Sequence, residues 1–320
     1  MPGSLAGELV PFGAAPDGRT AYVSAWTPAF AGVAALSLAT GRLTPISPFA
    51  SAAQDQADGA SSGPWLVWFQ TYSLTDLDRF RIYAWDAATG SLRVIGQSLQ
   101  APDGTPWPSP WHAPAVSGHY AAWAQGYGPG GLVEIELANL DNGAVTTLRR
   151  GHVQAPFFDG RLVVWPESDT PGSETTLRAF SVATHAPAAV SPVLAAVRGT
   201  DFVVTDGRRT AYFSPDFTGL FYSPAQDQAA RLVLRLTGGN DFTALALAPG
   251  TLAWTTTTAT YLASTSTGAF TQVTPRFGDA TGSSSVVLIS DAPAQQAEHP
   301  ALPTYVVDPA GIDWPACPAR

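Results

Sequence analysis

The stretch GRLVVW, residues 160–165, is the clearest indication of how the chain folds, because versions of it recur along the whole chain. Each version starts with glycine and continues as a run in which apolar residues alternate with others. A large apolar residue ends the run. The clearest other copies are GPWLVW (63–68) and GHYAAW (118–123), and the weaker ones are GRTAYV (18–23), GTDFVV (199–204), GTLAW (250–254) and GSSSVV (282–287). Alternating apolar residues indicate half-buried β-strands, so the chain repeats one strand-rich unit.

Further strands follow these copies at regular places. A second run ends in a turn, as in IYAWDAATG (82–90) and LRAFSVATH (177–185), and a third run follows, as in SLRVIG (91–96). The copies end 33 to 55 residues apart, with a mean of 44. A period of about 40 to 50 residues with several short strands is typical of a β-propeller blade.

We therefore predict an all-β protein, a β-propeller of seven blades with about four antiparallel strands each, in which residues 1–320 form one domain. Six blades with a terminal closing segment is the alternative. Residues 205–236 are the ambiguous region, because RTAYFSPDFTGLFYSP and RLVLRL both resemble strands, and the last copy leaves room for a thin blade only.

The composition excludes several classes of function. All 16 basic residues are arginine, which removes lysine chemistry such as Schiff bases. The net charge of -9 argues against a nucleic-acid partner, which would need a basic surface. A single cysteine, Cys317, cannot form an internal disulfide or a cysteine-rich metal site. No cofactor or metal is expected, and no apolar run is long enough to span a membrane.

The copies IYAWDAATG and GRLVVW resemble the blades of TolB-like and related bacterial β-propellers, in which a strand is followed by an aspartate and a TG turn. Asp86 holds the aspartate position and Asp308 is a second candidate, whereas Ser37 and Ser181 replace it in two copies. The resemblance implies architecture only. Such folds include peptidase accessory domains, lyases, sugar binders and adaptors, so it selects no function.

Polar residues that precede the first strands of the repeats form the candidate channel-mouth group. They are Asp55, His112, His152 and Asp241. Such a group could bind a cation or act in acid–base chemistry, because histidine and aspartate side chains titrate or coordinate. The alternative is an ordinary polar channel lining. The GASSG match at Ser61 lacks the helix that a nucleophile elbow requires, so no catalytic residue is assigned.

Two tryptophans stand outside the repeat, in DGTPWPSPWHAP (103–114). Trp107 and Trp111 lie in the connection between the second and third predicted blades, whereas the repeat positions indicate that five others are packing residues: Trp68, Trp85, Trp123, Trp165 and Trp254. Proline limits the entropy that a loop loses on binding, and tryptophan offers a flat apolar surface. A binding surface that includes His112 is one interpretation, and a buried plug is the other.

Three functions remain open. The leading hypothesis is a non-catalytic propeller that binds a protein partner or a glycan through its top face near the central channel. The alternatives are a lyase or hydrolase that uses His112 or His152 as an acid–base group, and a structural subunit of an extracellular assembly. We expect an extracellular, cell-surface or periplasmic location, with the cytoplasm as the alternative. The sequence does not specify the ligand or the oligomeric state.

Overall fold

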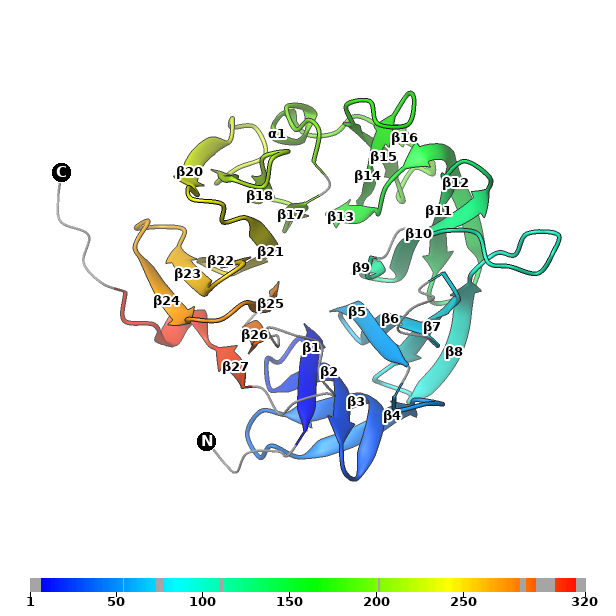
Figure 1. The fold of residues 1–320 in the computed structure, drawn as a ribbon, viewed down its shortest axis with the longest axis horizontal. Helices are drawn as coiled ribbons and strands as arrows, with labels where there is room; N and C mark the ends of the chain where they lie inside the picture. Colours follow the sequence, from blue (N-terminus) through cyan, green and yellow to red (C-terminus); the bar gives the residue numbers. More distant parts are fainter. Residues whose placement is uncertain are drawn as a thin grey trace.

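The computed structural model describes residues 7–53, 55–72, 78–109, 112–200, 202–282, 286–291 and 303–314. Figure 1 shows antiparallel sheets arranged around a central opening, with the strands of each sheet stepping outward from it. The prediction of an all-β propeller is confirmed at this level.

Consecutive strands build each sheet, and we number the sheets in chain order. Sheet 1 contains β1 (Glu8–Ala14), β2 (Thr20–Thr27), β3 (Phe30–Ser37) and β4 (Leu43–Pro48). Sheet 2 contains β5 (Gln56–Ser62), β6 (Trp65–Thr71), β7 (Phe80–Asp86) and β8 (Ser91–Gln97). Sheet 3 contains β9 (Ala115–Ser117), β10 (Tyr120–Gly128), β11 (Leu132–Asn139) and β12 (Val145–Val153). Sheet 4 contains β13 (Phe157–Asp159), β14 (Leu162–Ser168), β15 (Thr176–Ser181) and β16 (Ala186–Ala188).

The remaining sheets follow the same order. Sheet 5 contains β17 (Val203–Thr205), β18 (Thr210–Phe213), β19 (Gly219–Ser223) and β20 (Arg231–Arg235). Sheet 6 contains β21 (Phe242–Ala248), β22 (Thr251–Thr256), β23 (Thr260–Ser264) and β24 (Phe270–Thr274). Sheet 7 contains β25 (Gly278–Gly282), β26 (Val287–Asp291) and β27 (Thr304–Val307). Two short helices complete the described elements, α1 (Pro192–Ala195) and the 3₁₀ helix η1 (Pro309–Gly311).

The described strands thus form six sets of four and one set of three. Sheets 3 and 4 are continuous, because His152 and Val153 of β12 pair with β14. The predicted count of seven blades stays a prediction, since residues 292–302 beside the last set lie outside the description.

Antiparallel pairing gives the ring two distinct ends. One end carries the connections from the outermost strand of a sheet to the innermost strand of the next, and we call it the connection face. The opposite end carries the turns between the first and second and between the third and fourth strands, and we call it the turn face.

Tryptophans at the repeat position pack between neighbouring sheets, as the sequence predicts. Trp68 is fully buried against Phe12 and Val33 of sheet 1. In the same way Trp123 packs on sheet 2, and Trp165 packs on sheet 3. Burial of such large side chains is a main stabilising term between neighbouring sheets.

A bulge interrupts the outermost strand of five sheets at the same place. In sheet 2, for example, Ile82 pairs with Gly96 and Tyr83 pairs with Val94, which leaves Ile95 without a partner residue. The five extra residues are all apolar: Ile46, Ile95, Leu148, Val233 and Val273. A bulge increases the local twist, and here it turns an apolar side chain toward the next sheet.

The structure corrects the strand assignment of the repeat. The copies GRTAYV, GPWLVW, GHYAAW, GRLVVW and GTLAW lie in the second strands of their sheets, and innermost strands of three to seven residues precede them. The copy GSSSVV falls partly outside the described residues. GTDFVV is an exception, because Val203–Thr205 is itself the innermost strand β17 and the second strand is Thr210–Phe213. The ambiguous region 205–236 therefore belongs to one complete four-stranded sheet.

The two ends of the chain meet where sheet 7 packs on sheet 1. Val286 and Leu288 share a core cluster with Val23 and other residues of sheet 1. The Thr304 hydroxyl donates a 2.9 Å hydrogen bond to the Leu9 carbonyl oxygen. In the described part of the chain no strand crosses this seam, so side-chain packing and such single hydrogen bonds close the ring.

None of the helices in the described residues has the length and apolar character that a membrane span requires.

Candidate functional site

The predicted site residues that the structure describes all lie at or near the connection face. Asp55, His112 and Asp241 are in connections that lead into β5, β9 and β21, and His152 is near the end of β12. Trp111 lies outside the described residues. Trp107 is half-buried in the connection between β8 and β9.

Asp55 has a structural role in this arrangement. Its side chain is 1% exposed, and its carboxylate accepts hydrogen bonds from the Ala50 backbone N–H (2.8 Å) and from the Gln70 amide (3.3 Å). The first bond closes the connection between sheets 1 and 2 on itself, and the second ties it to strand β6. A buried carboxylate needs such donors, so Asp55 stabilises the connection rather than facing a ligand.

The other titratable candidates do not converge on one point. Asp241 is exposed, and His112 and His152 are half-buried. Within the described residues, no three His, Cys, Asp or Glu side chains gather closely enough to hold a metal ion. These residues therefore remain candidates for single contacts with a ligand.

The loop that carries Trp107 is held firmly on the propeller. The Ser109 N–H donates to the Asp78 carboxylate at 2.7 Å, and the Ser109 hydroxyl accepts from the Gly126 N–H at 2.9 Å. The Trp107 N–H donates to the Leu99 carbonyl oxygen at 3.0 Å. An added Cβ at Gly126 would lie 2.0 Å from the Pro108 carbonyl oxygen, so the loop contacts strand β10 directly.

A polar residue that was not predicted as functional stands two positions after three of the packing tryptophans. The Trp68 and Trp123 indole N–H groups donate to Gln70 and Gln125 at 3.4 and 3.3 Å. The Trp165 indole donates to Glu167 at 3.1 Å. The sequence signal is W-x-[QE], and these pairs satisfy indole donors that burial would otherwise leave without partners.

In sheet 3 this polar pattern extends into a buried pair of carboxylates. Glu134 accepts from the Gln125 amide and from the Arg150 guanidinium, both at 2.8 Å, and is 2% exposed. Burial raises the pKa of the adjacent Glu136, and the Glu134 charge adds to this rise. Arg150 also lies 5.2 Å from the centre of the Tyr127 ring. The contacts of this pair are therefore internal to sheet 3, between strands β10, β11 and β12.

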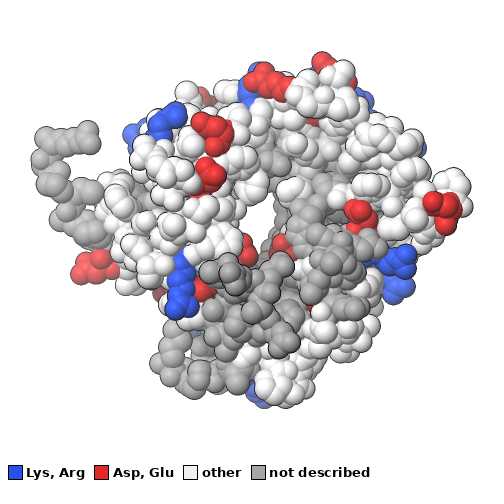
Figure 2. All heavy atoms as spheres, in the orientation of Figure 1, with Lys and Arg blue, Asp and Glu red and all other residues white. Residues whose placement is uncertain are grey.

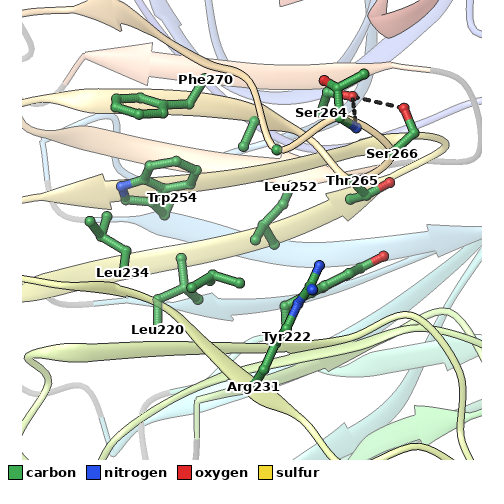
Figure 3. Close-up of a pocket in the computed structure, with 14 residues that line it drawn as sticks. Leu220, Tyr222, Arg231, Leu234, Leu252, Trp254, Ser264, Thr265, Ser266 and Phe270 are labelled. Carbon is green, nitrogen blue, oxygen red and sulfur yellow. Dashed lines mark hydrogen bonds between the residues drawn. The ribbon is translucent and has the colours of Figure 1, made fainter. Parts of the chain in front are cut away.

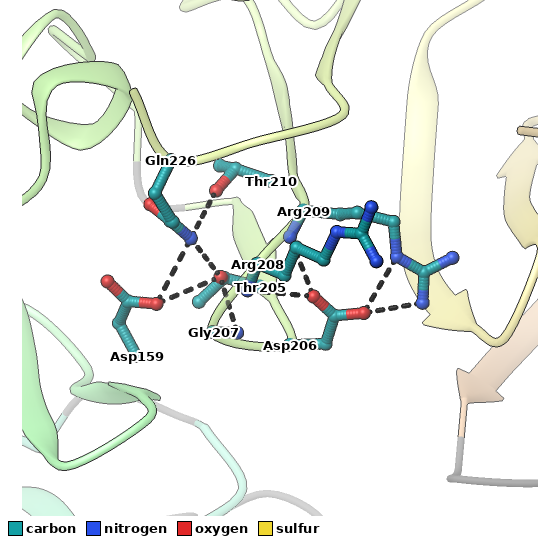
Figure 4. A network of polar contacts seen from close by, with 8 residues as sticks. All are labelled: Asp159, Thr205, Asp206, Gly207, Arg208, Arg209, Thr210 and Gln226. Atoms are coloured by element: carbon teal, nitrogen blue, oxygen red, sulfur yellow. Dashed lines mark hydrogen bonds and ion pairs between the residues drawn. The ribbon is translucent and has the colours of Figure 1, made fainter. Parts of the chain in front are cut away.

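A second polar network joins sheets 4 and 5 on the turn face (Figure 4). The Gln226 amide donates to Asp159, Thr205 and Thr210 at 3.0 to 3.2 Å. Asp159 is 8% exposed, and burial raises the pKa of its carboxyl group. Gln226 lies in the β19–β20 connection of sheet 5. Its amide therefore links sheet 5 to Asp159 of sheet 4 by a hydrogen bond.

Acidic side chains also border the central opening, as the red atoms at its rim show in Figure 2. Asp58 of β5 and Asp279 of β25 lie on innermost strands, close enough for their charges to interact. Loss of hydration raises the pKa of Asp58 to about 7, and the Asp279 charge contributes to this rise. The channel therefore disfavours a full negative charge at Asp58 at neutral pH.

Comparison with known proteins supports the fold. No protein-family model matches the chain, and no curated protein matches it by sequence. A structure from work on two prolyl endopeptidases matches over 95% of this chain and 47% of its own length, with a TM-score of 0.63 and 14% identity. The β-propeller domain of the Trilobed protease from Pyrococcus furiosus matches over 79% of this chain and 92% of its own, with a TM-score of 0.50 and 10% identity.

TolB from Acinetobacter baumannii also matches, over 96% of this chain and 65% of its own length, with a TM-score of 0.46 and 12% identity. The chain spans about half the length of the prolyl endopeptidase structure. Identities this low establish the fold alone, which is a β-propeller.

Proposed function

We propose that this chain is a non-catalytic β-propeller module that binds a protein partner or a glycan through its connection face. The main contact is the loop of residues 98–109, which carries Trp107, and Trp111 and His112 follow it in sequence. The observation that carries the proposal is the fixation of this loop by Asp78, Ser109 and Gly126.

A fixed loop binds at low entropic cost. Proline restricts the backbone at positions 106 and 108, and the hydrogen bonds to Asp78 and β10 hold the segment in place. Tryptophan has few rotatable bonds and a large apolar surface, so it suits a contact that buries one face. His112, His152 and Asp241 are the polar groups on the same face that would make additional contacts.

A peptide array and a glycan array probed with the labelled chain test this proposal. Trp107→Ala should weaken binding to the positive spots by about 30-fold, because an aromatic anchor of this kind contributes about 2 kcal/mol. Leu92→Ala is the control, because it removes a partly exposed apolar side chain from strand β8, outside the loop. It should leave the array signal unchanged. A large loss of thermal stability in Trp107→Ala would instead identify Trp107 as a packing residue and overturn the proposal.

A second candidate is a role beside or within a hydrolase, because the chain aligns with 47% of a prolyl endopeptidase structure. His112 or His152 at the channel mouth would then act as the acid–base group. Turnover of peptide amides or glycosides that His152→Ala abolishes would favour this candidate over binding alone.

The proposal includes a location outside the cytoplasm, in the periplasm or at the cell surface. Fractionation of cells that produce the tagged protein tests it.

A further inference from the structure

A cavity of about 200 Å³ lies between sheets 5 and 6, at a place that sequence analysis did not single out. Strands β19 and β20 form one wall, and β22, β23 and the turn of residues 265–269 form the other. Figure 3 shows that its residues come from these two neighbouring sheets. The turn belongs to the turn face, so the cavity is separate from the proposed binding loop.

The repeated bulge explains why the cavity occurs here. Four of the five bulge residues pack against the core clusters between their sheet and the next: Ile46, Ile95, Leu148 and Val273. The fifth, Val233, is 44% exposed and lines the cavity. The residue after the bulge also differs between the sheets. In β8 it is Gly96, which lets the strand approach the Trp123 ring, whereas in β20 it is Leu234, whose side chain prevents such a close approach. The space that is filled elsewhere is therefore open at this interface.

The inner part of the cavity is apolar and rich in aromatic surface. Trp254 is 4% exposed and stacks on Tyr261, with ring centres 5.6 Å apart and planes at 15°. Phe270 lies 6.4 Å from the Trp254 ring and is 60% exposed, more than any other large apolar side chain described. Leu220 and Leu252 complete this end. Such a surface favours a flat apolar ring.

The opposite end of the cavity is polar and carries a positive charge. Figure 3 places Arg231 and Tyr222 at this end, near Thr265. The Ser264 and Ser266 hydroxyls, which share a 3.0 Å hydrogen bond, lie on the same turn. Arg231 is the only charged residue that lines the cavity, and within the described residues it forms no ion pair. Arginine is always charged, so this end attracts an anion.

We propose that this cavity binds a small monocarboxylic acid with one aromatic ring. The ring would lie against Phe270 and Val233, the exposed apolar side chains of the lining, and the carboxylate would accept hydrogen bonds from Arg231. A cavity of about 150 Å³ accommodates one benzene ring, so the volume here suits a single ring with a short acid chain rather than a larger ligand. Charge complementarity selects the acid over a neutral or cationic analogue.

Fluorine NMR with 3-(4-fluorophenyl)propionate as the probe tests the proposal, with 3-(4-fluorophenyl)propanol as its uncharged analogue. We expect the acid to bind with a Kd of about 1 mM or tighter, a value that a ligand of this size can reach. Arg231→Gln should weaken the acid by about 10-fold and leave the alcohol unchanged, because only the charged hydrogen bond is lost.

Two further variants make the result specific to the cavity. Arg235→Gln removes an exposed arginine from the same strand outside the cavity, and it should leave binding unchanged. Val233→Trp should block the acid without lowering the melting temperature, because residue 233 is partly exposed. Absence of binding at about 10 mM acid, or equal binding by Arg231→Gln and the unaltered chain, would overturn the proposal. Neither result bears on Trp107, since the array test uses a different face.

Discussion

At the residue scale, Asp58 shows how the ring changes the chemistry of a single side chain. The unfolded chain has the ordinary aspartate pKa of 3.8, whereas loss of hydration in the channel raises the pKa of Asp58 to about 7 in the folded protein. Between these values the folded chain retains a proton that the unfolded chain releases. The contribution of Asp58 to the free energy of unfolding is therefore greatest below the unfolded pKa and is lost as the pH rises through the folded pKa.

We expect Asp58→Asn to reduce the decrease in stability between about pH 4 and about pH 7, because the amide does not titrate, whereas Glu136, whose pKa burial also raises, keeps its own contribution. Urea unfolding across this range measures the effect. Asp86→Asn is the matched control. A hydrogen bond from the Ala88 N–H lowers the pKa of Asp86, so its contribution is lost only in more acidic solution. If the free energy of unfolding of Asp58→Asn falls with pH as steeply as that of the unaltered chain, another group controls this pH dependence.

At the scale of single elements, the loop of residues 98–109 depends on the absence of a side chain at Gly126. An added methyl group there would lie 2.0 Å from the Pro108 carbonyl oxygen, closer than any van der Waals contact. The loop and strand β10 must therefore separate when Gly126 is replaced, which would also break the Gly126 to Ser109 hydrogen bond.

Gly126→Ala should accordingly increase hydrogen exchange of the loop amides, including the Trp107 N–H, and should reduce binding through this face. Gly128→Ala tests the same substitution two residues along β10, where the nearest atom to an added Cβ is a Leu132 side-chain carbon at 3.8 Å. It should leave the loop protected. Equal exchange in the two variants would mean that the loop is not fixed by this contact.

Elements also differ in how well the sequence predicts them. Second strands such as Trp65–Thr71 were predictable, because large aromatic residues and alternation mark a strand that packs on both faces. Innermost strands such as Ala115–Ser117 have three residues and no periodicity, so the sequence gives no signal for them. The cavity was equally hidden, because Val233 and Phe270 meet only through the packing of two sheets.

At the scale of the whole molecule, the seam between sheets 7 and 1 is the interface with the longest sequence separation. The Thr304 to Leu9 hydrogen bond joins residues 295 positions apart. Long-range contacts of this kind form late and are costly in loop entropy, and no strand crosses the seam within the described residues. The seam is therefore the place where the ring opens most readily.

Leu288→Ala should lower the free energy of unfolding by about 2–5 kcal/mol, because Leu288 is 1% exposed in the core of the seam. Hydrogen exchange should rise first in β1 and β26, while sheets 2 to 5 stay protected. Ile82→Ala, an equally buried change between sheets 2 and 3, should not expose the seam selectively. Uniform exchange in both variants would mean that the ring opens only as a whole.

The same closure gives the molecule a defined response to tension. The described chain begins just before β1 and ends after β27, in the two sheets that meet at the seam, and each sheet is built from consecutive strands. A pull between residues 7 and 314 therefore loads the seam before it reaches the hydrogen bonds within any complete sheet. Sheets 7 and 1 would separate first. The first extension would therefore be short, with the central opening widened and the strand pairing of sheets 2 to 6 intact.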